Sequence, residues 1–171
     1  SKVAKYLEDG KIVGWYQGRS EFGPRALGNR SILMSPKYKE NKDIINEKVK
    51  HREEWRPFAG VILKDYLQEY FEEGIDSPYM LYSQTVKEDK RDKIPAITHV
   101  DNTCRIQTVS EGILSELLEE YHKISGVPVL LNTSFNDSGE PIVETPQDAI
   151  DAFLNMNIDY LVMNNTIIGK N

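Results

Sequence analysis

A run of fourteen residues near the start of the chain contains three arginines and three glycines: Gly18-Arg19-Ser20-Glu21-Phe22-Gly23-Pro24-Arg25-Ala26-Leu27-Gly28-Asn29-Arg30-Ser31. This concentration of positive charge disfavours a compact fold unless a negative charge compensates it. Arginine carries a planar fork of donors that binds phosphate or carboxylate through two hydrogen bonds, and glycine lets backbone amides approach a ligand closely. The run therefore predicts an anion site. The alternative is a solvated loop whose arginines pair with neighbouring glutamates.

Charge is unevenly distributed along the chain. Residues 1–56 carry 13 Lys/Arg against 8 Asp/Glu, and residues 57–171 carry 8 against 19, giving net charges of +5 and −11. A chain with a pI near 5.2 does not have the broadly basic face of a protein that wraps duplex nucleic acid. A local basic pocket in an acidic body instead suits a small, highly charged ligand.

Length and composition predict one folded domain over residues 1–171. The chain is 39% hydrophobic and 28% charged, and no apolar run approaches the roughly 18 residues of a membrane span. With Cys104 as its single cysteine it forms no internal disulfide, and a cytoplasmic location is the default expectation. One cysteine and three scattered histidines do not supply the usual ligand set of a zinc site, so we expect no protein-bound metal.

Hydrophobic periodicity predicts alternating strands and helices. The expected strands are residues 11–17, 30–34, 58–63, 79–86, 103–109, 127–131, 159–163 and 166–168. The expected helices are residues 43–51, 65–73, 111–125 and one that starts at Thr145-Pro146, where Asp148 completes a capping box. Residues 87–93 read as an exposed loop. The alternation indicates an α/β or α+β sheet covered by helices.

A second cationic segment, with Lys50, Arg52 and Arg56, lies directly before the predicted strand 58–63. It is a candidate for binding the same anion. If the helix over residues 43–51 forms, however, Lys50 and Arg52 lie near its C-terminus, where the helix dipole favours cations. Spacing alone supports both interpretations equally.

Arg105 and Gln107 share one face of the predicted strand 103–109, because side chains alternate across a strand. An arginine and a glutamine on the same face can line a polar cleft. They can equally form the solvent face of an edge strand, which the pattern alone slightly favours.

Short polar side chains follow the apolar strand 127–131: Asn132, Thr133, Ser134 and Asn136. Ligands of open α/β sheets commonly bind where strands end, and these side chains donate and accept hydrogen bonds without bulk. The alternative is an ordinary turn, which favours the same residue types. No Walker pattern is present, so a nucleotide must be held without a P-loop.

Together these segments resemble the C-terminal, YrdC-like domain of the NodU/CmcH-type O-carbamoyltransferases. The matching blocks are residues 14–19, 21–33, 50–59, 99–109 and 127–143, so the resemblance covers nearly the whole chain. Gly60 and Asn102 depart from the pattern, which usually has proline and glycine at these positions. The departures concern local turns more than the chemistry.

The resemblance implies a single α/β domain with a YrdC-like twisted mixed β-sheet and flanking helices. It implies that the domain uses ATP with Mg²⁺ and carbamoyl phosphate to form carbamoyladenylate, and that an N-terminal domain of the ASKHA type passes the carbamoyl group to a hydroxyl. That partner domain is absent from this chain, and residues 1–7 resemble the middle of a helix. We therefore expect an excised or separately expressed domain that performs only the partial reaction.

The resemblance also assigns roles to individual residues. The catalytic candidates are Lys50, Arg52 and Arg105, and the substrate- and nucleotide-binding candidates are Arg25, Arg30, Arg56, Thr133, Ser134 and Asn136. No protein nucleophile is required, because a bound carbamate oxygen attacks the α-phosphorus and catalysis depends on positioning and charge. Magnesium is expected to be bound mainly through phosphate oxygens and water.

Two other classes of function are open at this stage. A YrdC-like protein of tRNA threonylcarbamoyladenosine synthesis would need a basic surface facing RNA, against which the net charge of −11 over residues 57–171 argues. A noncatalytic module that binds nucleotide and regulates a partner would share the same motifs. The sequence does not identify the hydroxyl acceptor or the oligomeric state.

Overall fold

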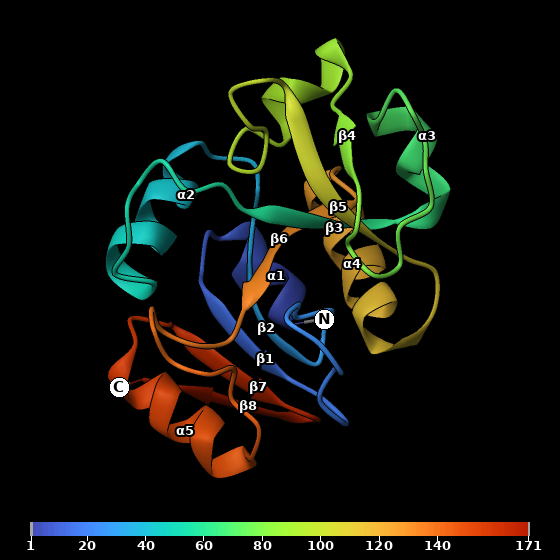
Figure 1. The fold of residues 1–171 in the computed structure, drawn as a ribbon. Coiled ribbons are helices and arrows are strands. Elements are labelled where there is room, and N and C mark those ends of the chain that lie inside the picture. Colours follow the sequence, from blue (N-terminus) through green and yellow to red (C-terminus); the bar gives the residue numbers. More distant parts are fainter. Residues whose placement is uncertain (1, 171) are drawn as a thin grey trace.

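The computed structural model describes residues 2–170 (Figure 1). The strands are β1 (Val13–Tyr16), β2 (Arg30–Met34), β3 (Ala59–Leu63), β4 (Ser83–Thr85), β5 (Thr103–Val109), β6 (Val129–Ser134), β7 (Tyr160–Met163) and β8 (Thr166–Gly169). The α-helices are α1 (Lys2–Glu8), α2 (Glu40–Ile44), α3 (Leu67–Tyr70), α4 (Gly112–Ser125) and α5 (Pro146–Asn155). A π-helix, η1 (Ile45–Val49), and two 3₁₀-helices, η2 (Lys64–Tyr66) and η3 (Glu88–Lys93), complete the described elements.

The described strands form one mixed sheet in the order β4-β5-β3-β6-β2-β1-β7-β8. The pairs β3/β5 and β1/β7 are parallel, and the other neighbours are antiparallel. Strands β2 and β3 are buried along their whole length, as expected of central strands with apolar sequences. The expected fold class, a mixed α/β fold with a twisted sheet and flanking helices, is confirmed.

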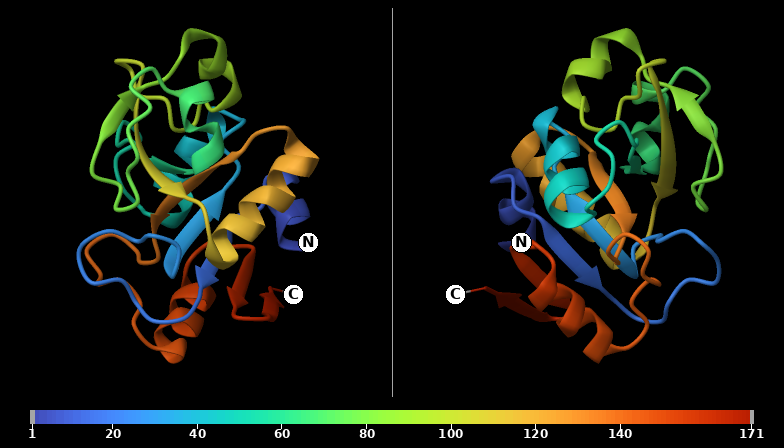
Figure 2. Two further views of the ribbon diagram at one scale, coloured as in Figure 1. Left: turned by 90° about the vertical axis from the view of Figure 1, so that its right-hand side faces the viewer. Right: turned by 60° about the vertical axis from the view of Figure 1, so that its left-hand side comes forward.

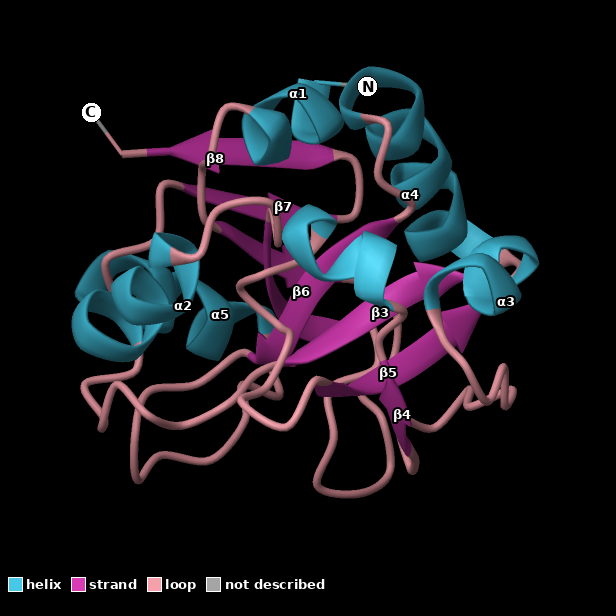
Figure 3. Ribbon diagram, turned by 90° about the horizontal axis from the view of Figure 1, so that it is seen from above, coloured by secondary structure: helices cyan, strands magenta, loops and turns pink. Residues whose placement is uncertain are grey.

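Helices α1 and α4 pack together, and α4 covers β3 and β6, whereas α5 packs on β1 and β7 (Figure 3). The start of α5 carries the predicted capping box between Thr145 and Asp148. Helix α4 ends at Gly126, whose φ of 73° is left-handed. Six apolar residues recur at helical spacing along α4, and four of them, Leu114, Leu117, Leu118 and Tyr121, are buried. The remaining two, Ile113 and Ile124, are 41% and 50% exposed.

The structure corrects four of the predicted elements. The helix expected over residues 43–51 begins at Glu40 as α2 and continues as the π-helix η1, because the Lys50 amide bonds to the carbonyl of Ile45 at 2.8 Å. The strand expected over 79–86 is limited to β4, since Met80 has a φ of 56° and interrupts the extended backbone. Residues 65–73 contain only the short η2 and α3, and the loop 87–93 contains η3.

Strand β6 extends three residues beyond the predicted end at Leu131, because its polar residues pair with β2. The register pairs Ser134 with Ser31 and Asn132 with Ala59, and β5 begins beside the start of β3. The end of β6 and the starts of β2, β3 and β5 therefore meet at one edge of the sheet. The loop after β1, in blue, and the loop after β6, in orange, lie side by side there in both views of Figure 2. A hydrogen bond from Ser20 Oγ to Glu144 Oε1 of 2.9 Å joins them.

The two departures from the family pattern have simple local explanations. Asn102 has a φ of 64°, a left-handed conformation that glycine adopts freely and asparagine tolerates. At Gly60, an added Cβ would lie 2.6 Å from Ile97 Cδ1 and 2.8 Å from Ile106 Cδ1, so the core is packed against this glycine.

Candidate anion-binding site

A cavity of about 120 Å³ opens at this edge of the sheet and is lined by three arginines, Arg25, Arg52 and Arg105. Arg25 comes from the loop between β1 and β2, Arg52 from the segment after η1, and Arg105 from β5. Thr133 and Ser134, at the end of β6, complete its polar wall. No aspartate or glutamate lines the cavity, so its described walls carry positive charge alone.

The three guanidinium groups lack compensating acids. Within residues 2–170, none of them forms an ion pair with a carboxylate, and Arg105 Nε is buried without a hydrogen-bond partner. Burial and the charge of Arg25 lower the pKa of Arg105. Burial and the charge of Arg56 likewise lower the pKa of Arg52. A bound anion would relieve both the desolvation and the repulsion.

Neutral amides form the floor next to these arginines. The Asn132 amide donates to Gln107 Oε1 at 3.0 Å and to the carbonyl of Ala26 at 3.2 Å, and Gln107 Nε2 donates to the carbonyl of Leu27 at 2.8 Å. This chain ties the loop that carries Arg25 to strands β5 and β6. The edge-strand interpretation of Arg105 and Gln107 was wrong, because β4 pairs outside β5 and Gln107 is only 3% exposed.

Lys50 lies behind the cavity wall and does not line the cavity. Its ammonium donates to the carbonyl and Oγ of Ser134 at 2.6 and 3.3 Å, and to the carbonyl and Oδ1 of Asn136 at 2.7 and 2.9 Å. Ser134 Oγ in turn donates to Asn136 Oδ1 at 2.6 Å. Burial, and then the charge of Arg52, lower the pKa of Lys50 to about 7. Lys50 is thus a buried lysine that holds Ser134 and Asn136 together through hydrogen bonds. It is not a solvated lysine at a helix end.

Arg30 is occupied by backbone oxygens. Its Nη1 donates to the carbonyls of Gln17 and Asn29 at 2.8 and 2.9 Å, and its Nη2 to those of Gly18 and Glu144 at 3.2 Å each. The guanidinium lies 3.6 Å from the centre of the Tyr16 ring, and the residue is 2% exposed. Arg30 therefore joins the loop after β1 to the loop after β6 through hydrogen bonds, and it lies outside the cavity.

Arg56 lies beside the cavity rather than in it. Its Nε is 2.8 Å from Glu53 Oε2, and it lines a neighbouring open depression of about 590 Å³. Of the predicted site residues, the structure therefore brings Arg25, Arg52, Arg105, Thr133 and Ser134 to one cavity. Lys50 and Asn136 support that cavity from behind.

Asn46, which is fully buried in η1, is a site residue that the sequence pattern did not indicate. Its Oδ1 accepts a 2.7 Å hydrogen bond from Arg52 Nε, and its amide donates to the carbonyls of Glu54 and Arg56 at 3.2 and 3.0 Å. Asn46 therefore fixes both the direction of Arg52 and the course of the following loop. An asparagine inside a predicted helix, where it is a poor helix former, was the available signal.

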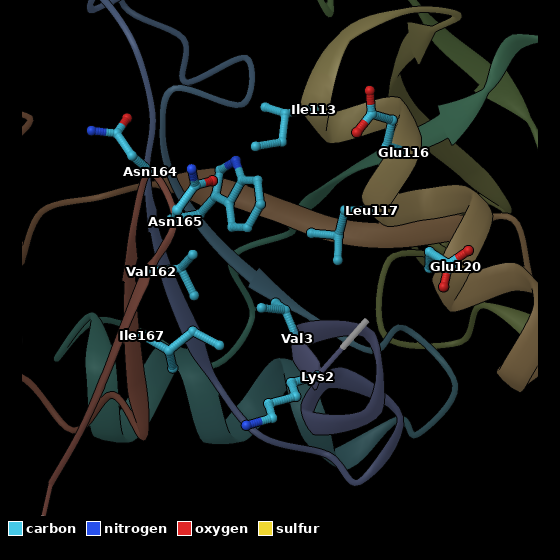
Figure 4. Close-up of a pocket in the computed structure, with 11 residues that line it drawn as sticks. Lys2, Val3, Ile113, Glu116, Leu117, Glu120, Val162, Asn164, Asn165 and Ile167 are labelled. Carbon is cyan, nitrogen blue, oxygen red and sulfur yellow. The ribbon is translucent and has the colours of Figure 1, made fainter.

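A larger cavity of about 390 Å³ lies elsewhere, between α1, the start of α4, and strands β1, β7 and β8 (Figure 4). Val3, Leu117, Val162 and Ile167 give it a mainly apolar wall, and Lys2 is its basic side chain. It has no arginine, so it does not correspond to the predicted anion site. In residues 2–170 no group of three or more His, Cys, Asp or Glu is placed to hold a metal, and none of the helices there is long and apolar enough to cross a bilayer.

A family model described as Carbamoyltransferase C-terminus matches residues 4–170. The chain belongs to this family. The carbamoyltransferase C-terminal domain is 48% identical to nodulation protein NolNO of Sinorhizobium fredii, over 99% of this chain and 26% of that protein. It is 46% identical to nodulation protein NolO of Bradyrhizobium diazoefficiens, over 99% of this chain and 32% of that protein. The resemblance to NodU-type carbamoyltransferases stated from the sequence is confirmed.

Among solved structures, full-length HypF in its phosphate- and nucleotide-bound form is similar to this carbamoyltransferase C-terminal domain, with a TM-score of 0.65. The similarity covers 96% of this chain and 24% of that one at 21% identity, and it shows the fold alone. The chain spans less than a third of the length of the two nodulation proteins.

Proposed function

We propose that this domain binds ATP and carbamoyl phosphate and forms carbamoyladenylate for transfer to a hydroxyl. The observation that carries the proposal is the cavity lined by Arg25, Arg52 and Arg105 without any acidic residue. Three cations without acidic partners at the end of a buried strand favour a ligand with several negative charges. Membership of the carbamoyltransferase family gives the chemical class of that ligand.

The proposed reaction needs charge stabilisation more than a reactive side chain. Carbamoyl phosphate and water first give carbamate and inorganic phosphate. A carbamate oxygen then bonds to the α-phosphorus of ATP, and the bond from that phosphorus to the pyrophosphate oxygen breaks. The arginines hold the two anions together against their mutual repulsion, while the Ser134 hydroxyl, which donates to Asn136 Oδ1 in this structure, would turn to donate to a phosphate oxygen.

Magnesium enters this proposal as a companion of ATP. Mg²⁺ prefers oxygen ligands, and the cavity offers it no carboxylate. Phosphate oxygens and water would therefore supply most of its ligands. When bound, the ion would offset phosphate charge.

The transfer step is proposed to lie outside this chain. The nodulation proteins are three to four times longer than the segment they share with it, since that segment is 26% and 32% of their length. We infer that a further domain of the carbamoyltransferase accepts the adenylate and selects the hydroxyl.

Calorimetry with Mg-ATP and with carbamoyl phosphate tests the binding, and pyrophosphate release tests the chemistry. We expect each ligand to bind and pyrophosphate to appear only when both are present. Binding of neither ligand at millimolar concentration contradicts the proposal. ATP binding without pyrophosphate release would instead support the noncatalytic module, and tight binding of tRNA would support the RNA-directed alternative.

A further inference from the structure

Two hollows meet at Arg52. One is the enclosed cavity of about 120 Å³ that Arg25 and Arg105 also line, and the other is the open depression of about 590 Å³ that Arg56 also lines. The lining of the depression consists of Glu47, His51, Arg52, Glu53, Arg56 and Ser138. Arg52 is the one residue common to the two described linings, so its guanidinium forms the boundary between them.

The two volumes differ in what they can hold. Pockets that enclose drug-sized ligands are about 300 to 1,000 Å³, so a cavity of about 120 Å³ is too small for a nucleotide but large enough for a phosphate-sized group. The depression is within that range and lies open to solvent at the exposed residues Glu47, Glu53 and Ser138. Of the two hollows, the depression is therefore the one whose size suits a nucleotide.

The side chains of the two linings also differ, and they favour the same assignment of ligands as the two volumes do. The enclosed cavity has arginines and no acid, which suits a compact anion. The depression combines Arg52 and Arg56 with the carboxylates of Glu47 and Glu53. Its arginines suit phosphate oxygens, and a carboxylate accepts hydrogen bonds from ribose hydroxyls or from an exocyclic amine. Its mixed charge thus suits a ligand with an anionic end and a hydrogen-bond-donating end.

The Arg52 side chain is fixed at this boundary by contacts with two neighbouring residues. Its Nε is bonded to Asn46 Oδ1 at 2.7 Å, and its guanidinium carbon lies 4.7 Å from the centre of the Phe58 ring. The terminal nitrogens of Arg52 make no hydrogen bond within residues 2–170, so they are available to ligands on either side.

We propose that the site is divided at Arg52, with the carbamoyl phosphate or carbamate group in the enclosed cavity and the nucleotide in the open depression. This inference rests on the proposed function, because it assigns the two ligands of that function to two places. It puts the α-phosphate at Arg52, where the carbamate oxygen can reach it. Glu47 then becomes a residue that selects a nucleoside over a bare polyphosphate.

Three matched substitutions test the division by calorimetry with carbamoyl phosphate and with Mg-ATP. Arg105→Gln should weaken carbamoyl phosphate binding about tenfold to a hundredfold and change ATP binding little, because one charge-assisted contact is lost. Arg56→Gln should do the reverse, and Arg52→Gln should weaken both. Arg19→Gln removes the same charge from an exposed residue that lines neither hollow and is the control.

A second measurement does not depend on arginine. Glu47→Ala should weaken Mg-ATP binding but leave sodium tripolyphosphate binding unchanged, with Glu40→Ala, also exposed and near η1, as the matched control. Ser138→Trp should obstruct ATP but not carbamoyl phosphate. If both ligands bind the wild-type chain but respond equally to Arg105→Gln and Arg56→Gln, the division is wrong and the proposed function stands. If neither ligand binds the wild-type chain, the proposed function itself fails.

Discussion

The Lys50 ammonium lies 2.9 Å from Oδ1 of Asn136, although 86 residues separate the two in the chain. Lys50 directly follows the π-helix η1, and its amide closes the last turn by donating to the carbonyl of Ile45. Lys50 thereby joins the segment that carries Arg52 to the segment that carries Ser134. This contact, together with those of Asn46 and of the Asn132–Gln107 pair, joins distant parts of the sequence at the candidate site.

Replacing Lys50 should therefore reduce stability as well as ligand binding. Lys50→Met removes the donor shared by four oxygens of Ser134 and Asn136 and leaves the half-buried carbonyl of Asn136 without its donor, which costs about 1–3 kcal/mol. Urea denaturation measures the free energy of unfolding, and Lys48→Met, at an exposed position of η1, is the control. A Lys50→Met protein as stable as the wild type would show that the hydrogen bonds of Lys50 do not contribute to the free energy of unfolding.

The lowered pKa of Lys50 also predicts a pH dependence. The pKa is about 7 in the folded chain against 10.5 for an ordinary lysine, so between these values the unfolded chain binds more protons than the folded one. Stability contributed at this residue therefore rises with pH from about 7 to 10.5 and is lost as the pH falls through that range. Unfolding free energies at pH 7 and pH 9 should differ more in the wild type than in Lys50→Met. Equal differences would exclude Lys50 as the source.

Replacing Arg105 should not reduce the stability of the fold, in contrast to replacing Lys50. Its Nε is buried without a partner and its charge faces Arg25, so Arg105→Gln removes an unfavourable charge from the empty site. We expect an unchanged or higher melting temperature together with the loss of carbamoyl phosphate affinity described above. A clear fall in melting temperature would identify Arg105 as a structural residue.

Arg30 is predicted to be structural despite its place in the arginine-rich run. Its four hydrogen bonds to backbone carbonyls connect the loops after β1 and β6, and Arg30→Gln should cost about 2 kcal/mol or more. Thermal and urea unfolding check the loss. If Arg30→Gln keeps full stability and loses only ligand binding, Arg30 contacts the ligand directly.

Ser134→Ala tests the polar end of β6 with a small change. The substitution removes the hydroxyl that lines the cavity, while the carbonyls of Ser134 and Asn136 still bind Lys50. We expect ligand affinity to fall by about tenfold, the loss of one hydrogen bond to a charged group, with little change in unfolding free energy. Unaltered affinity would place the bound phosphate away from Ser134.

Local features of this fold were predictable from sequence, and features that depend on strand order were not. Two helix ends were predictable because they depend on residues close together in the chain. They are the capping box of Thr145 and Asp148 and the glycine, Gly126, that ends α4. The π-turn of η1 has the same apolar spacing as an α-helix over its short length, and the sequence did not distinguish them. Arg105 looked like an edge residue because nothing in residues 103–109 shows that β4 pairs beside them.

The candidate site residues were found mainly through the family resemblance, and the structure separated their roles. The resemblance grouped Arg25, Arg30 and Arg56 as binding residues, but only the packing shows that they face a cavity, a set of carbonyls and an open depression respectively. Asn46 was missed because its function lies in a side chain buried under the following loop.

Within residues 2–170, the walls of the enclosed cavity contain no aspartate, glutamate, histidine, cysteine or lysine. Arginine keeps its proton throughout the physiological range, so the charge that these walls present is constant from mildly acidic to mildly basic solution. A change of affinity with acidity then originates in the ligand's own ionisation or in groups outside these walls, such as Lys50 behind them. A cavity whose walls keep a fixed charge can thus bind the dianion of a phosphate compound more tightly than its monoanion without any change in the protonation of the walls.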